Sequence, residues 1–210
     1  MTGANLLVAS VAFYVPSGTP TASHISDSSG NTWVALTAKT AVSSCGEMLF
    51  YAKNAAVGAS QTFTISKSGS YSSIVVMGFS GVDTTAPFDV ENGTNWSGTT
   101  AQPGSITPSV DNELVISGCG DAAPTTTWTC NGNFSGTEIY YNQVPSTTEG
   151  NALAYEIQTT ATARNPTWTL GTSGGGNVVI ASFKETVASG QPYAKRAGGI
   201  PHMARNRGVW

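Results

Sequence analysis

The chain has 210 residues and a net charge of −3, and only 10% of its residues are charged, against roughly 25% in a typical soluble domain. Its apolar residues form short β-branched and aromatic runs, and no window keeps the i, i+3, i+4, i+7 spacing of an amphipathic helix. This pattern excludes long helices, and the lack of a long apolar run excludes a membrane-spanning helix. The length allows one large β-domain or two small ones.

In chain order, the first strand candidates are separated by residues that favour turns. They cover Asn5–Tyr14, Thr32–Lys39, Glu47–Asn54, Gln61–Ser66 and Ser73–Ser80. A stretch rich in Pro, Gly and Thr follows, with weaker candidates at Phe88–Glu91 and Gly104–Thr107. The remaining candidates are Glu113–Gly120, Thr126–Asn131, Thr137–Gln143, Asn151–Gln158, Pro166–Leu170 and Asn177–Lys184.

These candidates form one series that occurs twice. Three pairs of apolar anchors are offset by 104 or 105 residues: Tyr51 with Tyr155, Phe79 with Phe183, and Phe63 with Trp168. A near-constant offset indicates an internal repeat. We therefore predict an all-β fold, an antiparallel β-sandwich of jelly-roll or concanavalin-like type, built by tandem duplication over residues 1–187. Its halves are 5–82 and 113–185, with a linker at 83–112. One compact sandwich is favoured over two sandwiches in tandem.

The first half begins late in comparison with the second. Two weak strand candidates precede Leu114, whereas only five residues precede Leu6. A sheet edge that lacks its neighbouring strand is both an aggregation liability and a docking site. We predict that this edge is covered by the C-terminal tail or by a strand from another subunit.

Residues 188–210 match neither half and form an extended tail. The tail has four bases and no acid, whereas residues 1–187 hold all 12 acids and five bases, a net charge of −7. Such asymmetry indicates that the tail has its own partner. We predict an assembly tail that contacts other copies of the chain or neighbouring proteins; the alternative is a flexible end. Its candidate contact residues are Tyr193, Lys195, Arg196, Ile200, Met203, Arg205, Arg207 and Trp210.

The three cysteines allow two interpretations. Cys119 and Cys130 flank an expected loop and could form a disulfide that leaves Cys45 as a thiol, or all three could be buried thiols. Neither a Cys-x-x-Cys motif nor a Cys/His cluster occurs, so we expect no metal and no cofactor. The Asp27 loop carries oxygen ligands, but Asp27 is better explained as a residue that hydrogen-bonds its own turn.

Catalytic machinery is not evident. The sequence has two histidines, His24 and His202, and no Gly-x-Ser-x-Gly motif. Asp89 and Glu91 alternate as a pair of carboxylates on one strand would, but they follow a turn and have no counterpart in the other half. We therefore expect no enzymatic activity and no catalytic residues. A polysaccharide-cleaving enzyme remains an alternative if the isolated acids converge, namely Glu47, Glu138, Glu149 and Glu156.

Trp96 lies in a polar stretch with Asn92 and Asn95. An exposed indole with amide neighbours could stack on a sugar ring, so these three residues are the candidate ligand-binding site for a surface glycan. The alternative is that Trp96 anchors the stretch by packing. The acidic body disfavours nucleic acid as a partner, and no membrane partner is expected.

Three segments, Asp27–Trp33, Leu49–Asn54 and Phe79–Asp89, resemble in their order a β-sandwich module of tailed-phage virion proteins and bacterial surface proteins. The resemblance covers residues 5–187, and residues 198–210 are similar to the C-terminal ends of phage structural proteins. The resemblance implies a fold and a setting but no catalytic residues. Together with the uneven charge, the late start of the first half and the absent signal-peptide pattern, it leads us to expect a structural role in a virion, as a capsid decoration or tail-associated protein. The alternatives are a carbohydrate-binding or adhesive module and the polysaccharide-cleaving enzyme considered above. The alternative location is a bacterial cell surface or secretion. Because the N-terminus lacks a signal-peptide pattern, we expect release within a particle.

Overall fold

The computed structural model describes residues 3–40, 45–66, 72–122, 127–134 and 149–186, and the backbone of residues 135–141 and 202–204. In this part of the chain nearly all regular structure is antiparallel strand, apart from 3-10 turns at Val15–Ser17 and Ala22–His24. The prediction of an all-β fold with antiparallel sheets is therefore confirmed. No helix among the same residues is long and apolar enough to cross a membrane.

The first sheet takes four strands from the N-terminal part of the chain and one from its end. The order is β13–β6–β1–β4–β3. The central strand β1 is paired on both sides, so that Leu6 lies opposite Lys53 of β4 and Phe79 of β6. The strands are β1 (Leu6–Tyr14), β3 (Val34–Ala35), β4 (Cys45–Lys53), β6 (Ser72–Phe79) and β13 (His202–Ala204).

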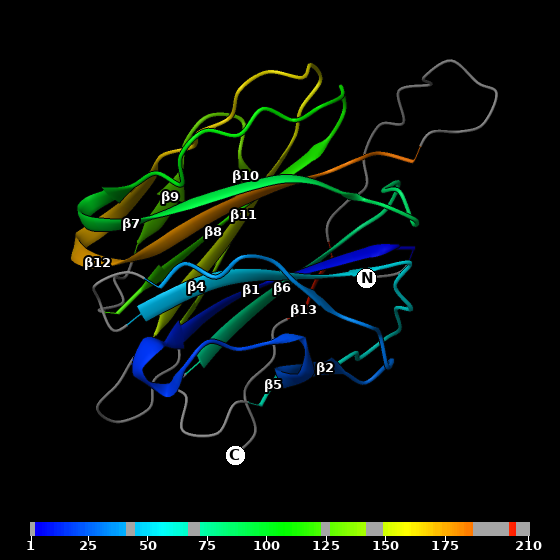
Figure 1. The fold of residues 1–210 in the computed structure, drawn as a ribbon, viewed down its shortest axis with the longest axis horizontal. Helices are drawn as coiled ribbons and strands as arrows, with labels where there is room; N and C mark the ends of the chain where they lie inside the picture. Colours follow the sequence, from blue (N-terminus) through cyan, green and yellow to red (C-terminus); the bar gives the residue numbers. More distant parts are fainter. Residues whose placement is uncertain are drawn as a thin grey trace.

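The second sheet lies above the first in Figure 1 and has the order β10–β11–β8–β12–β7, with β9 also paired to β12. Its central strand β8 is paired on both sides, with Leu114 opposite Ile157 of β11 and Phe183 of β12. The strands are β7 (Phe88–Ala101), β8 (Leu114–Asp121), β9 (Trp128–Cys130), β10 (Ser135–Tyr141), β11 (Gly150–Ile157) and β12 (Trp168–Phe183).

The two sheets have the same strand order when β1, β4 and β6 are matched with β8, β11 and β12. Across the gap between the sheets, β4 contacts β12 and β6 contacts β11, which are equivalent contacts under this match. Beyond this common set, β7 pairs with β12 and β13 pairs with β6. In the chain β7 precedes its central strand, whereas β13 follows every other strand.

Both faces of the central strands β1 and β8 are buried, which explains why these strands are apolar in long runs instead of alternating. One core lies between the sheets. A second core covers the outer face of the first sheet beneath β2 (Ile25–Asp27) and β5 (Phe63–Ile65), where Trp33 packs edge-on against Phe63. A third covers the outer face of the second sheet, where Trp128 packs edge-on against Trp168.

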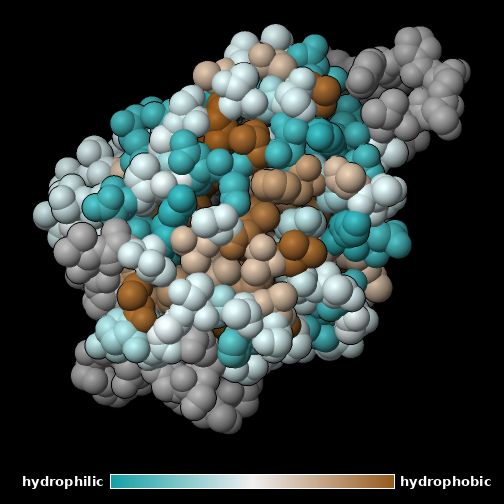
Figure 2. Space-filling view, in the orientation of Figure 1, coloured by the Kyte–Doolittle hydropathy of each residue, from teal (hydrophilic) through white to brown (hydrophobic). Residues whose placement is uncertain are grey.

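Three aromatic pairs of described residues cross the gap between the sheets. Tyr51 stacks on Phe88 of β7 with ring centroids 6.3 Å apart, and the other two pairs resemble each other. Tyr51 of β4 meets Phe183 of β12 with ring centroids 5.4 Å apart, and Tyr155 of β11 meets Phe79 of β6 at 5.2 Å. Both pairs are edge-to-face, the arrangement that aromatic quadrupoles favour. Through the two edge-to-face pairs each sheet gives one Tyr and one Phe to the shared core, and β7 adds Phe88. Figure 2 shows apolar residues gathered in the middle of one face, where the sheets meet in Figure 1.

The Asp27 carboxylate holds the segment Asp27–Trp33 together through hydrogen bonds. Its Oδ1 accepts hydrogen bonds from the Ser29 backbone N–H at 2.8 Å and from Asn31 Nδ2 at 3.0 Å, and its Oδ2 accepts one from Trp33 Nε1 at 2.8 Å. The carboxylate thus satisfies its own turn and fixes the indole that packs on Phe63, as an Asx residue at a turn does.

Two strands are longer than the sequence indicates. The predicted strands Pro166–Leu170 and Asn177–Lys184 are parts of one strand, β12, which continues through Gly174–Gly176. Gly176 is required there, because a Cβ at this position would lie 2.0 Å from the Gly120 carbonyl oxygen. The weak candidate Phe88–Glu91 is the start of the 14-residue strand β7, so the segment expected as a linker contributes a full strand. Thr32–Lys39 shortens to Val34–Ala35.

Gly118 allows the two sheets to approach each other closely. A Cβ at this position would lie 2.5 Å from Ser10 Oγ and 3.0 Å from Glu47 Oε1 of the facing sheet. We expect Gly118→Ala to lower the free energy of unfolding in urea by about 1–3 kcal/mol. Gly58→Ala is the matched control, since its Cβ would meet nothing within 4 Å. Equal stability of the two variants would contradict this close approach.

Candidate assembly edge

The outer edge of β6 carries a short ladder with β13. His202, Met203 and Ala204 lie opposite Gly78, Met77 and Val76, and Figure 1 shows β13 beside β6. Among the residues that the structure describes, this ladder covers three of the eight residues of β6. The equivalent strand β12 is paired with β7 near both of its ends, from Trp168 opposite Ala101 to Phe183 opposite Phe88, with an irregularity between Thr169 and Gly174.

β13 occupies on β6 the place that β7 occupies on β12. Phe79 and Phe183 are equivalent, since they lie opposite the first leucine of β1 and of β8. Counting back from them, Met77 matches Ala181, and these residues lie opposite Met203 of β13 and Glu91 of β7. Both outer strands are antiparallel to their partners. Three residues near the far end of the chain therefore lie along part of the edge that we expected the tail or another subunit to cover.

The composition of β6 makes it a good acceptor of a further strand. Its sequence, Ser-Ser-Ile-Val-Val-Met-Gly-Phe, contains no charged residue and no proline, the two devices that usually prevent a strand edge from pairing. Val76 and Met77, which the ladder reaches, are 2% and 0% exposed. An antiparallel strand laid along this edge gains main-chain hydrogen bonds together with apolar contact.

The tail residues predicted from the sequence are only partly visible. Met203 belongs to β13, whose backbone pairing is given above. The other predicted contact residues lie outside the described residues, namely Tyr193, Lys195, Arg196, Ile200, Arg205, Arg207 and Trp210.

Of the three candidate glycan-binding residues, only Asn95 is exposed. Trp96 is 8% exposed in the core outside the second sheet, and its indole N–H donates to the Gly120 carbonyl at 3.2 Å. Asn92 donates to the Ser105 carbonyl at 3.0 Å and is half-buried. The burial of Trp96 favours a packing role over stacking on a sugar. The alternation of side chains along a strand could have indicated the burial of Trp96. Val90 and Trp96 are an even number of residues apart on β7, so they lie on the same face and pack on the same core.

A polar cluster closes one end of the gap between the sheets. Ser10 Oγ lies 2.5 Å from Glu47 Oε1 and 2.9 Å from Asn151 Oδ1, and Asn151 Nδ2 donates to the carbonyls of Ser10 at 2.7 Å and Ser73 at 3.2 Å. Asn177 adds a further link between the sheets, since its Nδ2 donates to a first-sheet carbonyl at 2.5 Å. These side chains are almost fully buried, so the cluster ties the sheets together where apolar contacts end.

The cluster implies that Glu47 is protonated. Ser10 has one hydroxyl proton but lies against two oxygen acceptors, and the amide of Asn151 already uses its nitrogen for two carbonyls. Both contacts are satisfied when the Glu47 carboxyl donates to Ser10 Oγ and Ser10 donates to Asn151. Burial, followed by the charge of Glu149, raises the pKa of Glu47 well above its usual range, and Ser10 opposes this shift in part.

Glu149 extends the cluster of carboxyl groups. It is 3% exposed, and burial together with the nearby charge of Asp121 raises its pKa to about 7, against a hydrogen bond from Cys45 that lowers it. Of the four isolated acids considered for catalysis, the structure brings Glu47 and Glu149 together. It also places Asp121 beside Glu149, which nothing in the sequence indicated. All three are sealed between or beside the sheets, where water and a polysaccharide have little access.

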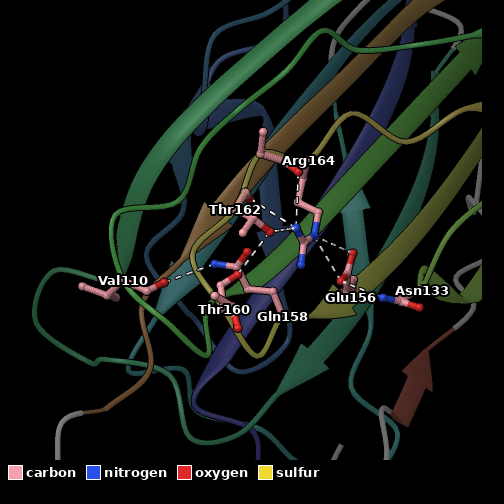
Figure 3. Close-up of polar contacts among 8 residues, drawn as sticks. Val110, Asn133, Glu156, Gln158, Thr160, Thr162 and Arg164 are labelled. Atoms are coloured by element: carbon pink, nitrogen blue, oxygen red, sulfur yellow. Dashed lines mark hydrogen bonds and ion pairs between the residues drawn. The ribbon is translucent and has the colours of Figure 1, made fainter.

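The remaining acids of that set hold other parts of the structure together. Glu156 accepts two 3.1 Å hydrogen bonds from Arg164 Nε and one of 3.4 Å from Asn133 Nδ2 (Figure 3). In the same view, Gln158 Nε2 donates to the Val110 carbonyl at 3.1 Å. Glu156 is therefore a partner in an ion pair on the outer face of the second sheet. The side chain of Glu138 lies outside the described residues.

Asp89 and Glu91 attach β7 to its surroundings. Asp89 accepts hydrogen bonds from Ser109 at 2.7 and 2.8 Å and forms an ion pair with Lys184 at 3.0 Å. Glu91 accepts a hydrogen bond of 2.6 Å from the Thr37 hydroxyl, and this bond connects β7 to the N-terminal half of the chain. The alternation of these two acids therefore has a structural explanation.

The three cysteines are not joined by a disulfide, so the predicted alternative of a Cys119–Cys130 bond is wrong. Cys119 is buried in the core outside the second sheet, and burial raises its pKa well above the ordinary value; burial raises that of Cys130 to about 12. Thiols with such pKa values are poor nucleophiles and metal ligands. Among the described residues, no group of three or more His, Cys, Asp or Glu side chains is arranged to hold a metal ion.

No protein-family model matches the chain, and no curated protein or solved structure is significantly similar to it. The resemblance to β-sandwich modules of phage and bacterial surface proteins therefore stays a prediction. The function has to be inferred from the geometry of the chain itself.

The buried carboxyl groups predict a fold that is less stable at higher pH. An unfolded Glu has a pKa of about 4.3, whereas that of Glu149 is raised to about 7. Between these values the folded state binds more protons than the unfolded state. The contribution of Glu149 to the free energy of unfolding is therefore complete below about pH 4.3 and is lost as the pH rises towards 7. We expect the free energy of unfolding in urea to be higher at pH 5 than at pH 8, and Glu149→Gln to reduce this difference.

Glu185→Gln is the matched control, because it removes a carboxylate outside the gap between the sheets and should keep the full pH dependence. Two results would contradict the expected protonation of the cluster. One is a parent protein whose free energy of unfolding rises between pH 5 and pH 8, and the other is a Glu149→Gln variant in which this free energy depends on pH as in the parent.

Proposed function

We propose that the chain is a non-enzymatic structural module of a phage virion, a capsid decoration or tail-associated protein, that assembles through the edge of β6 and the C-terminal tail. The observation that carries this proposal is the short β13–β6 ladder, in which three tail residues lie on a strand edge with no charge or proline to protect it. The partners are other copies of the chain and neighbouring virion proteins, and the location is the particle.

We also propose that residues 1–187 form an antiparallel β-sandwich that arose by tandem duplication, with halves 5–82 and 113–185. The common strand order of the two sheets supports this origin. Further support comes from the aromatic pairs, because Tyr51–Phe183 and Tyr155–Phe79 exchange places under the repeat offset and have nearly the same geometry. A duplicated module whose first copy lacks an outer strand leaves one edge for a segment from elsewhere.

The distribution of charge favours assembly over a freely moving end. The tail carries four bases and no acid, whereas the body has a net charge of −7. Opposite charges steer a tail towards a body and hold it there at moderate ionic strength, within the roughly 8 Å screening length of physiological salt. The low charge of the whole chain also leaves little repulsion between neighbouring bodies.

The two alternative functions receive less support. Stacking on a glycan needs an exposed aromatic ring, and Trp96 is packed against the second sheet with its N–H on Gly120. Cleavage of a polysaccharide needs two carboxyl groups in a cleft, and Glu47 and Glu149 are buried at the junction of the sheets.

Removal of residues 188–210 tests this proposal. We expect the full chain to associate as its concentration is raised in sedimentation velocity, and the shortened chain to sediment as a monomer with unchanged circular dichroism and cooperative unfolding. The reason is that the deletion removes β13 and the tail's bases but none of the strands of the shared core.

A second variant separates the strand from the charge. The double substitution Met203→Pro with Ala204→Pro keeps every base, but it removes backbone N–H groups on both sides of β13. It should behave like the deletion, whereas Met203→Ala, the matched control, should associate like the parent. A full chain that stays monomeric at every concentration, or a shortened chain that associates equally well, would refute assembly through the tail.

A further inference from the structure

We infer that the carboxyl groups of Glu47 and Glu149 form a proton-dependent latch that closes one end of the gap between the two sheets. While both carboxyl groups hold a proton this end is shut, and loss of the protons opens it and exposes the Cys45 thiol. The opening is local and leaves the rest of the sandwich folded. The inference concerns a different part of the molecule from the β6 edge, so it does not depend on the proposed function.

The latch lies where glycines let the sheets approach closely. A Cβ on Gly120 of β8 would lie 2.7 Å from Glu47 Oε2 and 3.2 Å from Cys45 Sγ, which both belong to the facing sheet. Glu47 and Cys45 are 0% exposed, and Glu149, which directly precedes β11, is 3% exposed. Both carboxyl groups are therefore enclosed by protein and have almost no contact with water.

Each of the two carboxyl groups has one oxygen without a partner. Glu47 Oε2 and Glu149 Oε2 are buried and accept no hydrogen bond, although Glu47 Oε1 contacts Ser10. A carboxylate at either position would lack the donors that water supplies, and an isolated buried charge of this kind is very costly. The closed junction therefore fits the protonated form of both groups.

The other ionisable groups at the junction are acids and thiols. Burial and the charge of Asp121, at the end of β8, raise the pKa of Glu149 to about 7, against a hydrogen bond from Cys45. Burial and the charge of Glu149 raise the pKa of Glu47. Cys119 of β8 lies near the charges of Glu47 and Asp121, but it packs in the core outside the second sheet.

No base among the described residues neutralises these acids. Lys39 lies opposite Glu47 in a β-bridge, but its stem packs against Gly93 of β7, and the two residues form no ion pair. Lys67 lies outside the described residues. At this end of the gap the strands β1, β6 and β12 contribute uncharged polar residues, namely Ser10, Ser73 and Asn177.

Loss of the protons therefore favours an open junction. In the closed state two carboxylates would lie beside Asp121 without water or a cation, whereas water solvates them when the end is open. A solvated Glu has a pKa of about 4.3, and that of Glu149 in the closed state is about 7. Opening releases protons between these values, and each released proton shifts the equilibrium towards the open state about tenfold per pH unit.

The opposite end of the gap is apolar and stays packed. Tyr51 and Tyr155 lie near the ends of β4 and β11 that are far from the latch, and their rings pack on Phe183 and Phe79 across the gap. Because these contacts do not depend on a titrating carboxyl group, only the end that holds the latch responds to the pH.

The match between the strands indicates that an amide fits in place of the acid. Counting back from Tyr51 and Tyr155, Glu47 of β4 corresponds to Asn151 of β11. Both side chains contact Ser10 Oγ, at 2.5 and 2.9 Å. One half of the chain therefore places an acid where the other half places an amide, in the same hydrogen-bonded cluster. Glu47→Gln keeps the size of the side chain and removes its titration.

The exposure of Cys45 tests the latch, with Cys119 as a control in the same molecule. Cys119 is also 0% exposed, but the core that covers it remains in place when the sheets part at one end. The full chain with Cys130→Ala is labelled in short pulses with methyl methanethiosulfonate at pH 5 and pH 8, and each labelled thiol is quantified by peptide mass spectrometry. Dividing each rate by that of the urea-unfolded chain at the same pH gives the protection of the thiol.

We expect the protection of Cys45 to be lower at pH 8 than at pH 5 by about tenfold or more, and that of Cys119 to change much less. The double substitution Glu47→Gln with Glu149→Gln should make the protection of Cys45 the same at both pH values. Glu185→Gln is the matched control and should behave like the parent, because Glu185 lies outside the gap between the sheets.

Three results would overturn the latch. Protection that falls equally at Cys45 and Cys119 would show that the whole fold unfolds, and unchanged protection of Cys45 in the parent would show that this end does not open. A double Gln variant that keeps the pH dependence of the parent would show that other groups cause it. If circular dichroism shows that the double variant is unfolded, the comparison of the two thiols in the parent still decides.

Discussion

Tyr51 packs edge-on against Phe183 and Tyr155 packs edge-on against Phe79, so these two pairs join the sheets through one Tyr and one Phe from each. Each sheet turns an apolar inner face towards the other, and these two faces together form the core between the sheets. Neither sheet can bury its inner face without the other. The two halves of the chain therefore depend on each other for folding. The outer strands β7 and β13 are additions to this common framework.

The same shared face becomes polar at one end. Gly118 brings the backbone of the second sheet close to Ser10 and Glu47, and Asn151 bridges to the carbonyls of the first sheet. A protonated Glu47 completes this network with neutral hydrogen bonds, which avoids the high cost of a buried unpaired charge. The carboxyl groups that could suggest catalysis are thus better explained as part of the junction between the sheets.

Much of this framework could be predicted from the sequence, because its strands are apolar, β-branched and bounded by turns. The expected offset of 104 residues relates Tyr51 to Tyr155 and Phe79 to Phe183, and these four residues form two edge-to-face ring pairs. The length of β7 could not be predicted, since its residues are mostly polar and its pairing with β12 is long-range. The burial of Trp96 and the three-residue strand β13 depend on tertiary contacts that have no local signal.

The central claim is that β6 needs a C-terminal strand where β12 has β7. Amide hydrogen exchange, followed by mass spectrometry, measures this requirement directly in the full chain and in a chain that ends at residue 187. The account predicts that amides of Val76–Gly78 exchange faster when the tail is absent, while those of the equivalent residues Ile180–Ser182 keep their protection. Unchanged exchange at Val76–Gly78 would contradict the account.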